Sequence, residues 1–170
     1  MPTDASPLIR PVCAEDDLAR ITDLIHAAYA PHATQGLRYW GTHQTLEDTA
    51  KRFAMGMGLV MLEGDDYVGT ATLRRPQPQS AVALYRDPQV WSLSQFCIAP
   101  SAKGKGYGKL LHTHLLNVAR QAGATTLALD TAQPATALIA MYEFWGYRMV
   151  GECDWRPFTN YPSVVMAQPL

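Results

Sequence analysis

One short segment in the second half of the chain contains three glycines and three lysines. Residues 100–109 read Pro-Ser-Ala-Lys-Gly-Lys-Gly-Tyr-Gly-Lys and separate a strand-like run from a helix-like run. Glycine lets backbone N–H groups approach a ligand closely, and the first turn of a helix offers unpaired donors at the positive end of its dipole. A strand, a glycine loop and a helix in this order therefore predict a phosphate-binding site, with a merely charged turn as the alternative.

The spacing of these glycines excludes two common phosphate-binding motifs. A Walker A loop needs a glycine five residues before Gly-Lys-Ser/Thr, but Gly108-Lys109 has Lys103 at that place and Leu110 after it. A dinucleotide fingerprint that started at Gly104 would need its third glycine where Lys109 stands. The remaining pattern is a basic residue followed by two spacers and then alternating glycines. A protein that binds another nucleotide through the same loop stays an alternative.

This loop and two further segments resemble the GNAT superfamily of acyl-CoA-dependent N-acyltransferases. The segment Phe96-Cys-Ile-Ala-Pro100 resembles the end of the family's central strand, whose free backbone groups pair with the pantetheine arm of coenzyme A. The segment Met141-Tyr-Glu-Phe-Trp-Gly-Tyr147 matches the pattern Leu-Tyr-x-x-x-Gly-Phe. Lys103 stands where the family usually has Arg or Gln, and Ala135 stands where it often has Asn.

The resemblance implies a single N-acetyltransferase domain over residues 1–170, with the specific motifs within 91–151. It implies acetyl-CoA as cosubstrate, an amine acceptor, no metal, and direct transfer of the acetyl group in a ternary complex. Tyr142 occupies the position of the family's frequent catalytic tyrosine, and an ordinary core tyrosine is the alternative. The residues implied in acetyl-CoA binding are Phe96, Cys97, Ile98, Lys103, Gly104, Lys105, Gly106, Tyr107, Gly108 and Lys109.

The proton on the acceptor amine needs a base, because an ammonium group has an ordinary pKa of about 10.4. The family commonly uses a glutamate of the central strand, but this strand offers Ser92, Ser94 and Gln95. We therefore expect a water chain or a carboxylate from elsewhere, with Asp130 at the end of the next strand as the candidate. Cys97 can in principle carry the acetyl group as a thioester, but no histidine lies near it in the sequence, and a small apolar filler is the ordinary reading.

The periodicity of apolar residues predicts an α+β fold with a mixed, largely antiparallel central sheet and helices packed on both faces. Pro31 is expected to end the first helix, and Thr45 to Asp48 resembles a capping box at the start of the second. Gly123 is expected just past the end of the third helix. The predicted helices cover residues 14–29, 45–54, 108–122 and about 138–145. The predicted strands cover residues 8–12, 59–62, 67–73, 90–98, 126–130, 147–152 and 163–167.

Composition limits the classes of binding partner and the cellular compartment to be expected. Fourteen basic and fifteen acidic side chains give a net charge of −1, so the chain lacks the basic excess that binds nucleic acid or anionic membranes. Cys13, Cys97 and Cys153 are widely scattered, which favours reduced thiols and a cytoplasmic protein. The first seven residues lack a signal-peptide pattern, and residues 53–62 form an apolar run too short to span a bilayer.

Several questions stay open at this level. His112 and His114 lie two residues apart on a predicted helix, so they point to different sides, and a solvated helix surface is expected rather than a metal site. The segments Arg38-Tyr-Trp40 and Phe158-Thr-Asn-Tyr161 are candidates for walls of the acceptor pocket. A homodimer is possible. The acceptor is expected to be a small molecule, an amino acid or a peptide, with a protein acetyltransferase or a non-catalytic acyl-CoA sensor as alternatives.

Overall fold

The computed structural model describes residues 6–170, so the expectation about the start of the chain lies mostly outside the described residues. Its centre is a seven-stranded sheet in the order β1-β2-β3-β4-β5-β7-β6, in which only β4 and β5 run parallel. The strands are β1 (Leu8–Pro11), β2 (Gly56–Glu63), β3 (Asp66–Arg74), β4 (Val90–Ile98), β5 (Thr126–Ala132), β6 (Arg148–Asp154) and β7 (Pro162–Pro169). The helices are α1 (Leu18–Thr34), α2 (Leu46–Ala54), α3 (Tyr107–Gln121) and α4 (Thr136–Phe144).

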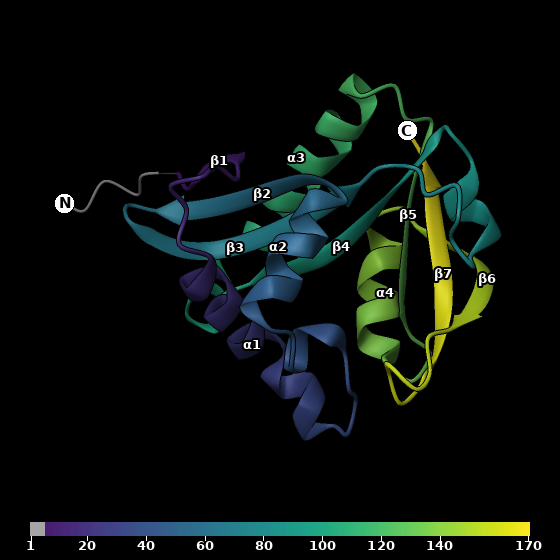
Figure 1. The fold of residues 1–170 in the computed structure, drawn as a ribbon, viewed down its shortest axis with the longest axis horizontal. Helices are drawn as coiled ribbons and strands as arrows, with labels where there is room; N and C mark the ends of the chain where they lie inside the picture. The colour runs from purple at the N-terminus through teal and green to yellow at the C-terminus, as the bar shows by residue number, and fades with distance from the viewer. Residues whose placement is uncertain (1–5) are drawn as a thin grey trace.

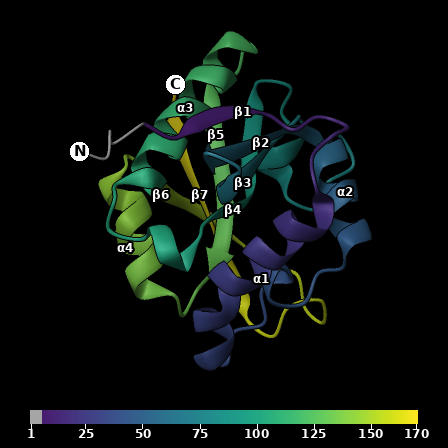
Figure 2. The same cartoon turned by 90° about the vertical axis from the view of Figure 1, so that its left-hand side faces the viewer.

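Helices cover both faces of this sheet. Figure 2 shows α1 and α2 on one side of the strands and α3 and α4 on the other. Each layer buries an apolar stripe: α1 contributes Ile21 and Ile25, and α3 contributes Leu111 and Leu115, all fully buried. The predicted α+β fold, with its mostly antiparallel sheet and two helical layers, is confirmed. Within residues 6–170, the chain forms no helix that is both long and apolar enough to cross a membrane.

The sheet opens at its centre. β4 and β5 pair only at their beginnings, over Val90–Ser92 and Thr126–Ala128. Beyond these pairs the two strands diverge, as Figure 1 shows between β4 and β5. Each strand keeps its other neighbour, because β4 pairs with β3 and β5 pairs with β7 along most of their lengths. The facing edges of β4 and β5 are thus left open to a ligand.

A β-bulge interrupts β4 beside this opening. Thr72 pairs with Ser94 and Thr70 pairs with Cys97, so β4 has one more residue than β3 over this step. Gln95 lies in the bulge with φ +53°, a left-handed conformation that a residue with a side chain adopts only when its surroundings hold it. Its amide group is buried and hydrogen-bonded on both sides, to Gln44 and to Thr72. The bulge redirects the end of β4 away from β5.

Several local predictions hold in the structure. The capping box is present, since Thr45 accepts from the Asp48 N–H and the Asp48 carboxylate accepts from the Thr45 N–H. The strand over residues 90–98 has the bounds that the sequence predicts. Gly123 follows the end of α3 with φ +88°, as expected of a glycine at that position.

The predicted end of the first helix at Pro31 is wrong. The helix α1 includes Pro31 and continues to Thr34. A proline lacks its own N–H, but later N–H groups resume the pattern, because Gln35 donates to the carbonyls of Pro31 and His32. The added turn is held by ring contacts, with the His32 ring 4.7 Å from the Tyr39 ring. Tertiary packing therefore overrides the local stop signal.

The expected solvated position of His112 is also wrong. His112 is 2% exposed, and its Nε2 lies 2.8 Å from the Tyr147 hydroxyl. Its ring stacks on Trp145 at 4.8 Å between centroids, which joins α3 to the end of α4. Burial lowers the pKa of His112 from 6.5 to about 4. The side chain is a neutral contact between two helical segments. The described residues contain no group of three or more His, Cys, Asp or Glu side chains that could hold a metal ion.

The titration of His112 predicts acid sensitivity of the fold. The folded state keeps the imidazole neutral down to about pH 4, whereas the unfolded chain binds a proton below 6.5. The unfolding free energy therefore falls as the pH falls through this window, and His112 accounts for about 2–3 kcal/mol of the loss between about pH 7.5 and 4.5. Urea unfolding of the wild type and of His112→Gln at both pH values measures this loss of unfolding free energy. Equal pH dependence in the two proteins would contradict the assignment.

Candidate functional site

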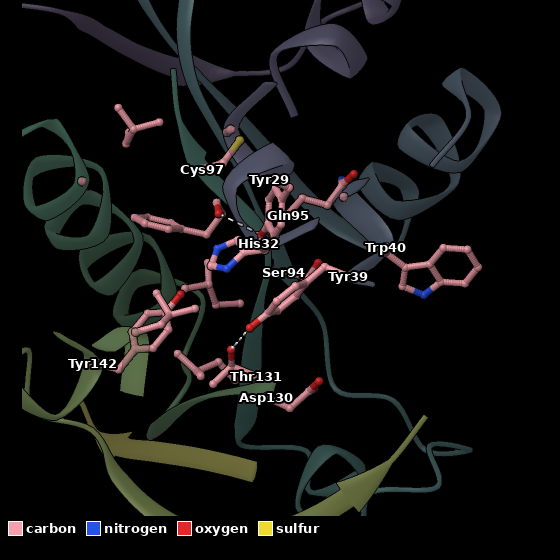
Figure 3. Close-up of a pocket in the computed structure, with 18 of the residues that line it drawn as sticks. Tyr29, His32, Tyr39, Trp40, Ser94, Gln95, Cys97, Asp130, Thr131 and Tyr142 are labelled. Carbon is pink, nitrogen blue, oxygen red and sulfur yellow. Dashed lines mark hydrogen bonds between the residues drawn. The ribbon is translucent and has the colours of Figure 1, made fainter. Parts of the chain in front are cut away.

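A cavity of about 430 Å³ occupies the opening between β4 and β5. Figure 3 shows the side chains that converge on it from α1, the following loop, β4, β5 and α4. Seven aromatic side chains contribute to its wall: Tyr29, Tyr39, Trp40, Phe96, Tyr142, Trp145 and Trp155. The same wall has few charged groups.

The strand segment predicted to bind the pantetheine arm lines this cavity. Phe96, Cys97 and Ile98 all belong to its wall. The Tyr29 hydroxyl donates a hydrogen bond of 3.0 Å to the Phe96 carbonyl, so this carbonyl has a side-chain partner from α1. A ligand with amide groups can pair with the edge of β4 that β5 leaves open.

The glycine loop has the shape expected of an anion-binding turn. Gly104 and Gly106 have φ of +83° and +77°, and α3 begins directly afterwards at Tyr107. Added Cβ atoms at Gly104 and Gly106 would meet nothing within 4 Å, so the glycines are required for backbone conformation and not for space. The first turn of α3 therefore presents its N–H groups next to a left-handed turn.

The residues of this loop divide into two groups. Lys103 and Gly108 line the cavity, while Gly104, Lys105, Gly106, Tyr107 and Lys109 belong to the same loop and first turn outside the cavity wall. The Lys105 ammonium group forms an ion pair with Glu63 at 3.2 Å. Lys103 is exposed at the cavity edge, where it adds positive charge.

Tyr142, to which the resemblance implies a catalytic role, lies on the cavity wall. It comes from α4, is 7% exposed, and packs edge-on against Trp145 and Tyr147. Burial raises the pKa of Tyr142 well above its usual value, so the hydroxyl keeps its proton. Among the described residues this hydroxyl has no hydrogen-bond partner, which leaves its proton available to a ligand.

Asp130 also lines the cavity, from β5, but its carboxylate is already hydrogen-bonded. Oδ2 accepts from the Tyr85 hydroxyl at 2.5 Å and Oδ1 accepts from Trp155 Nε1 at 2.8 Å. Arg74 Nη2 lies 3.9 Å from Oδ2, too far for a hydrogen bond. These contacts hold the Asp130 carboxylate in one orientation.

Cys97 is unsuited to covalent catalysis. It is 6% exposed, and burial raises the pKa of its thiol from 9.0 to about 12. A thiol that stays protonated is a poor nucleophile, and no histidine activates it within the described residues. The burial of Cys97 therefore supports its interpretation as a small apolar side chain that packs in the core.

The profile of the acetyltransferase (GNAT) family matches residues 18–147. The chain belongs to this family. No curated protein sequence gives a significant match to this GNAT chain.

Solved structures share the GNAT fold over nearly the whole chain. A GNAT family acetyltransferase from Elizabethkingia anophelis with acetyl-CoA bound has a TM-score of 0.70 at 13% identity, covering 99% of this chain and 100% of its own. The ribosomal-protein-S18-alanine N-acetyltransferase from Escherichia coli has a TM-score of 0.71 at 17% identity, covering 96% and 93%. An acetyltransferase from Streptococcus agalactiae 2603 has a TM-score of 0.71 at 21% identity, covering 97% and 99%. At these identities the likeness concerns the fold.

The sequence motifs give no indication of three titratable residues that line this GNAT cavity. His32 lines it from the last turns of α1, and burial lowers its pKa below 6.5, with Lys103 as a second cause. Arg52 from α2 and Arg74 from β3 line it as well. Because the sequence predicts that the first helix ends at Pro31, it does not indicate that His32 lies on this helix and faces the cavity. A cavity wall assembled from helices and strands far apart in the sequence gives no local motif for the two arginines.

The two aromatic segments expected to wall an acceptor pocket lie together. Trp40 stacks on Phe158 at 6.0 Å between ring centroids, and Arg38 donates to the Phe158 carbonyl at 3.1 Å. Tyr39, Trp40 and Thr159 belong to the cavity wall. This part of the GNAT cavity is thus closed by contacts between the loop after α1 and the loop before β7.

The glycine loop allows a test with opposite signs at two positions. Gly106→Ala forces a side chain into a left-handed conformation and is expected to lower the unfolding free energy by about 1 kcal/mol. Gly108→Ala, in the first turn of α3 with its nearest neighbour at 3.6 Å, is expected to raise it by up to about 1 kcal/mol. Denaturant unfolding of both variants checks this. The same sign at both positions would show that the loop geometry is not as described.

Proposed function

We propose that the protein is an N-acetyltransferase that moves an acetyl group from acetyl-CoA to a primary amine of a small molecule, amino acid or peptide. One observation carries the proposal: the opening between β4 and β5 joins a glycine turn at the start of α3 to an aromatic cavity that contains Tyr142. The acetyl-CoA bound to the Elizabethkingia relative, whose structure shares the fold, supports this cosubstrate.

Each part of acetyl-CoA has a proposed partner in the site. The pyrophosphate binds the N–H groups around Gly104, Gly106 and Gly108 and the lysines of the same turn. The pantetheine amides pair with the free edge of β4 at Phe96 to Ile98, and the thioester enters the cavity. Tyr107 and Lys109 follow the glycine turn on α3 and complete the proposed contacts.

The transfer proceeds directly between the two bound substrates. The neutral amine nitrogen attacks the thioester carbonyl carbon, and a base removes one proton from that nitrogen. The carbon–sulfur bond then breaks, and the Tyr142 hydroxyl gives its proton to the departing thiolate. Solvent returns a proton to Tyr142. This role fits the unpartnered, protonated hydroxyl of Tyr142, and the protonated thiol of Cys97 disfavours an acetyl-cysteine intermediate.

Two side chains on the cavity wall can accept the proton of the amine. Asp130 is the carboxylate that the sequence predicts, and His32 is an imidazole that burial keeps neutral near pH 7. Ser94 of β4 also lines the cavity, and its buried hydroxyl has no hydrogen-bond partner in the described part of the chain. It can orient a water molecule between amine and base.

We further propose a cytoplasmic location. All three cysteines are free thiols, which suits a reducing compartment. The near-neutral charge argues against nucleic acid and anionic membranes as partners. The homodimer expected from the resemblance stays a prediction.

The deciding experiment is thiol release from acetyl-CoA with a panel of amines, next to calorimetric titration of acetyl-CoA into the protein. Binding and release together support the enzyme. Binding without release from small amines, amino acids or peptides would instead indicate an acyl-CoA sensor, and release only with protein N-termini would indicate a protein acetyltransferase. Failure to bind acetyl-CoA, with protection against heat by ATP, would contradict the proposal.

Tyr142→Phe isolates the proposed proton donor. It should lower kcat by about 10²- to 10⁴-fold while changing the Kd of acetyl-CoA by less than about threefold, because only the departing thiolate needs the hydroxyl. Tyr147→Phe is the matched control, since Tyr147 is equally buried but bonds His112 and does not line the cavity. Wild-type turnover in Tyr142→Phe would contradict the role of Tyr142 as proton donor to the thiolate.

The pH–rate profile separates the two candidate bases. A base must be unprotonated, so kcat/KM falls as the pH falls through its pKa, and for His32 this limb lies below 6.5. Substitution of the residue that acts as base, by Asp130→Asn or His32→Gln, should abolish the acidic limb of the pH profile. The same variant should have a kcat/KM lower by about 10²- to 10⁴-fold. An unchanged profile in both variants would leave water as the acceptor of the proton.

A further inference from the structure

The charged groups that line the cavity have an excess of positive charge at the end away from the glycine loop. Lys103 belongs to the loop and is assigned to the pyrophosphate of the cosubstrate. Among the described residues the remaining fully charged groups of the wall are Arg52, Arg74 and Asp130. Two guanidinium groups and one carboxylate leave one net positive charge, and an uncompensated charge is costly in a cavity lined mostly by uncharged side chains.

Arg52 is the source of this excess. Its Nη1 donates to the Gln44 side-chain oxygen at 2.9 Å, and within residues 6–170 no carboxylate forms an ion pair with it. A guanidinium has five N–H donors, so most of them are left for a ligand. Burial lowers the pKa of Arg52 and the charge of Arg74 adds to this, as expected of a cation that lacks its counter-ion.

A chain of buried amides holds Arg52 in place. Gln44 Nε2 donates to Gln95 Oε1 at 2.7 Å, and Gln95 Nε2 donates to the Thr72 hydroxyl at 2.9 Å. Gln44 and Gln95 are 1% and 2% exposed. Through these bonds the guanidinium is tied to the β4 bulge, beside the point where the acetyl group is transferred. A surface arginine that merely complements the end of α2 would not need such a buried support.

Arg74 is held by a separate set of contacts. Its Nε donates to the Ser92 hydroxyl at 2.9 Å, and its guanidinium lies 5.0 Å from the Tyr85 ring centroid. Asp130 is 3.9 Å away and already accepts from Tyr85 and Trp155, so it neutralises Arg74 only in part. Arg74 therefore keeps donors that face the same cavity as Arg52.

We propose that Arg52 and Arg74 bind a carboxylate of the acceptor, so that the amine that receives the acetyl group belongs to a free amino acid or another small amino-carboxylate. The inference rests on the proposed function. The planar fork of a guanidinium matches the two oxygens of a carboxylate, and one monoanion balances the net charge of this end of the cavity, whereas a phosphate dianion would exceed it. The aromatic wall, with Tyr39, Trp40 and Trp155, packs the carbon skeleton between the two ends.

The test compares acceptors that differ only in this group. Amino acids and the ω-amino acids from glycine to 6-aminohexanoate are each paired with their carboxamide and with the alkylamine of the same length, and kcat/KM is expressed per neutral amine. We expect at least one amino-carboxylate to exceed its partners by about 10- to 100-fold, mainly through a lower KM. Thiol release from the amides or alkylamines, or only from protein N-termini, at rates that match or exceed those of every amino-carboxylate would overturn the inference while the proposed function stands.

Variants then assign the preference to the two arginines. Arg52→Gln and Arg74→Gln should each reduce the preference for the carboxylate by about tenfold or more and leave the Kd of acetyl-CoA within about threefold, and Arg52→Lys should restore part of it. Arg75→Gln is the matched control, because Arg75 is the exposed neighbour of Arg74 and does not line the cavity. A preference that survives in both glutamine variants would contradict the assignment. If no acceptor of any kind releases thiol, the proposed function fails and this inference falls with it; the wild-type comparison stays decisive if a variant does not fold.

Discussion

The site depends on the loss of pairing between β4 and β5 after their first three residues. A parallel pair that continued to Ile98 and Ala132 would fill the cavity with backbone and leave no edge for a ligand. The separation leaves N–H and C=O groups of both strands without a strand partner, and such groups are costly when buried. The fold tolerates the opening because other groups reach these edges.

Two tyrosines supply part of this compensation. The Tyr29 hydroxyl donates to the Phe96 carbonyl on β4, and the Tyr39 hydroxyl accepts from the Ala132 N–H on β5 at 3.3 Å. Tyr39 also shares a hydrogen bond of 3.0 Å with the Thr131 hydroxyl, which Figure 3 shows at the lower edge of the cavity. Both tyrosines come from α1 and the loop after it, and their rings lie 5.6 Å apart. The helix α1 and the loop after it therefore stabilise the open edges of the two separated strands and form part of the wall of the site.

The sequence indicates the proposed cosubstrate half of the site more fully than the proposed acceptor half, and the reason is geometric. The strand edge, the glycine turn and the first turn of α3 are contiguous in the chain, between Phe96 and Lys109, so their arrangement follows from local backbone chemistry. The φ values of Gly104 and Gly106 show the glycine requirement that the sequence suggests. The α+β class also follows from periodicity, because each element shows the spacing of apolar residues that its layer needs. The continuation of α1 past Pro31 and the burial of His112 do not follow from the local sequence. Both depend on contacts with aromatic rings that are distant in the chain.

The acceptor half is assembled from residues that only the tertiary structure brings together. Arg52 comes from α2, Arg74 from the end of β3 and Asp130 from β5, and no spacing in the sequence relates them. They share the requirement of charges on a partly buried cavity wall: each charge must be hydrogen-bonded, paired or neutralised by a ligand. Asp130 meets this demand through Tyr85 and Trp155, and Tyr142 meets it by keeping its proton, but Arg52 does so only in part, through one amide. An anion on the second substrate would complete the balance, and its binding would place the amine of that substrate between the two arginines and the thioester on β4.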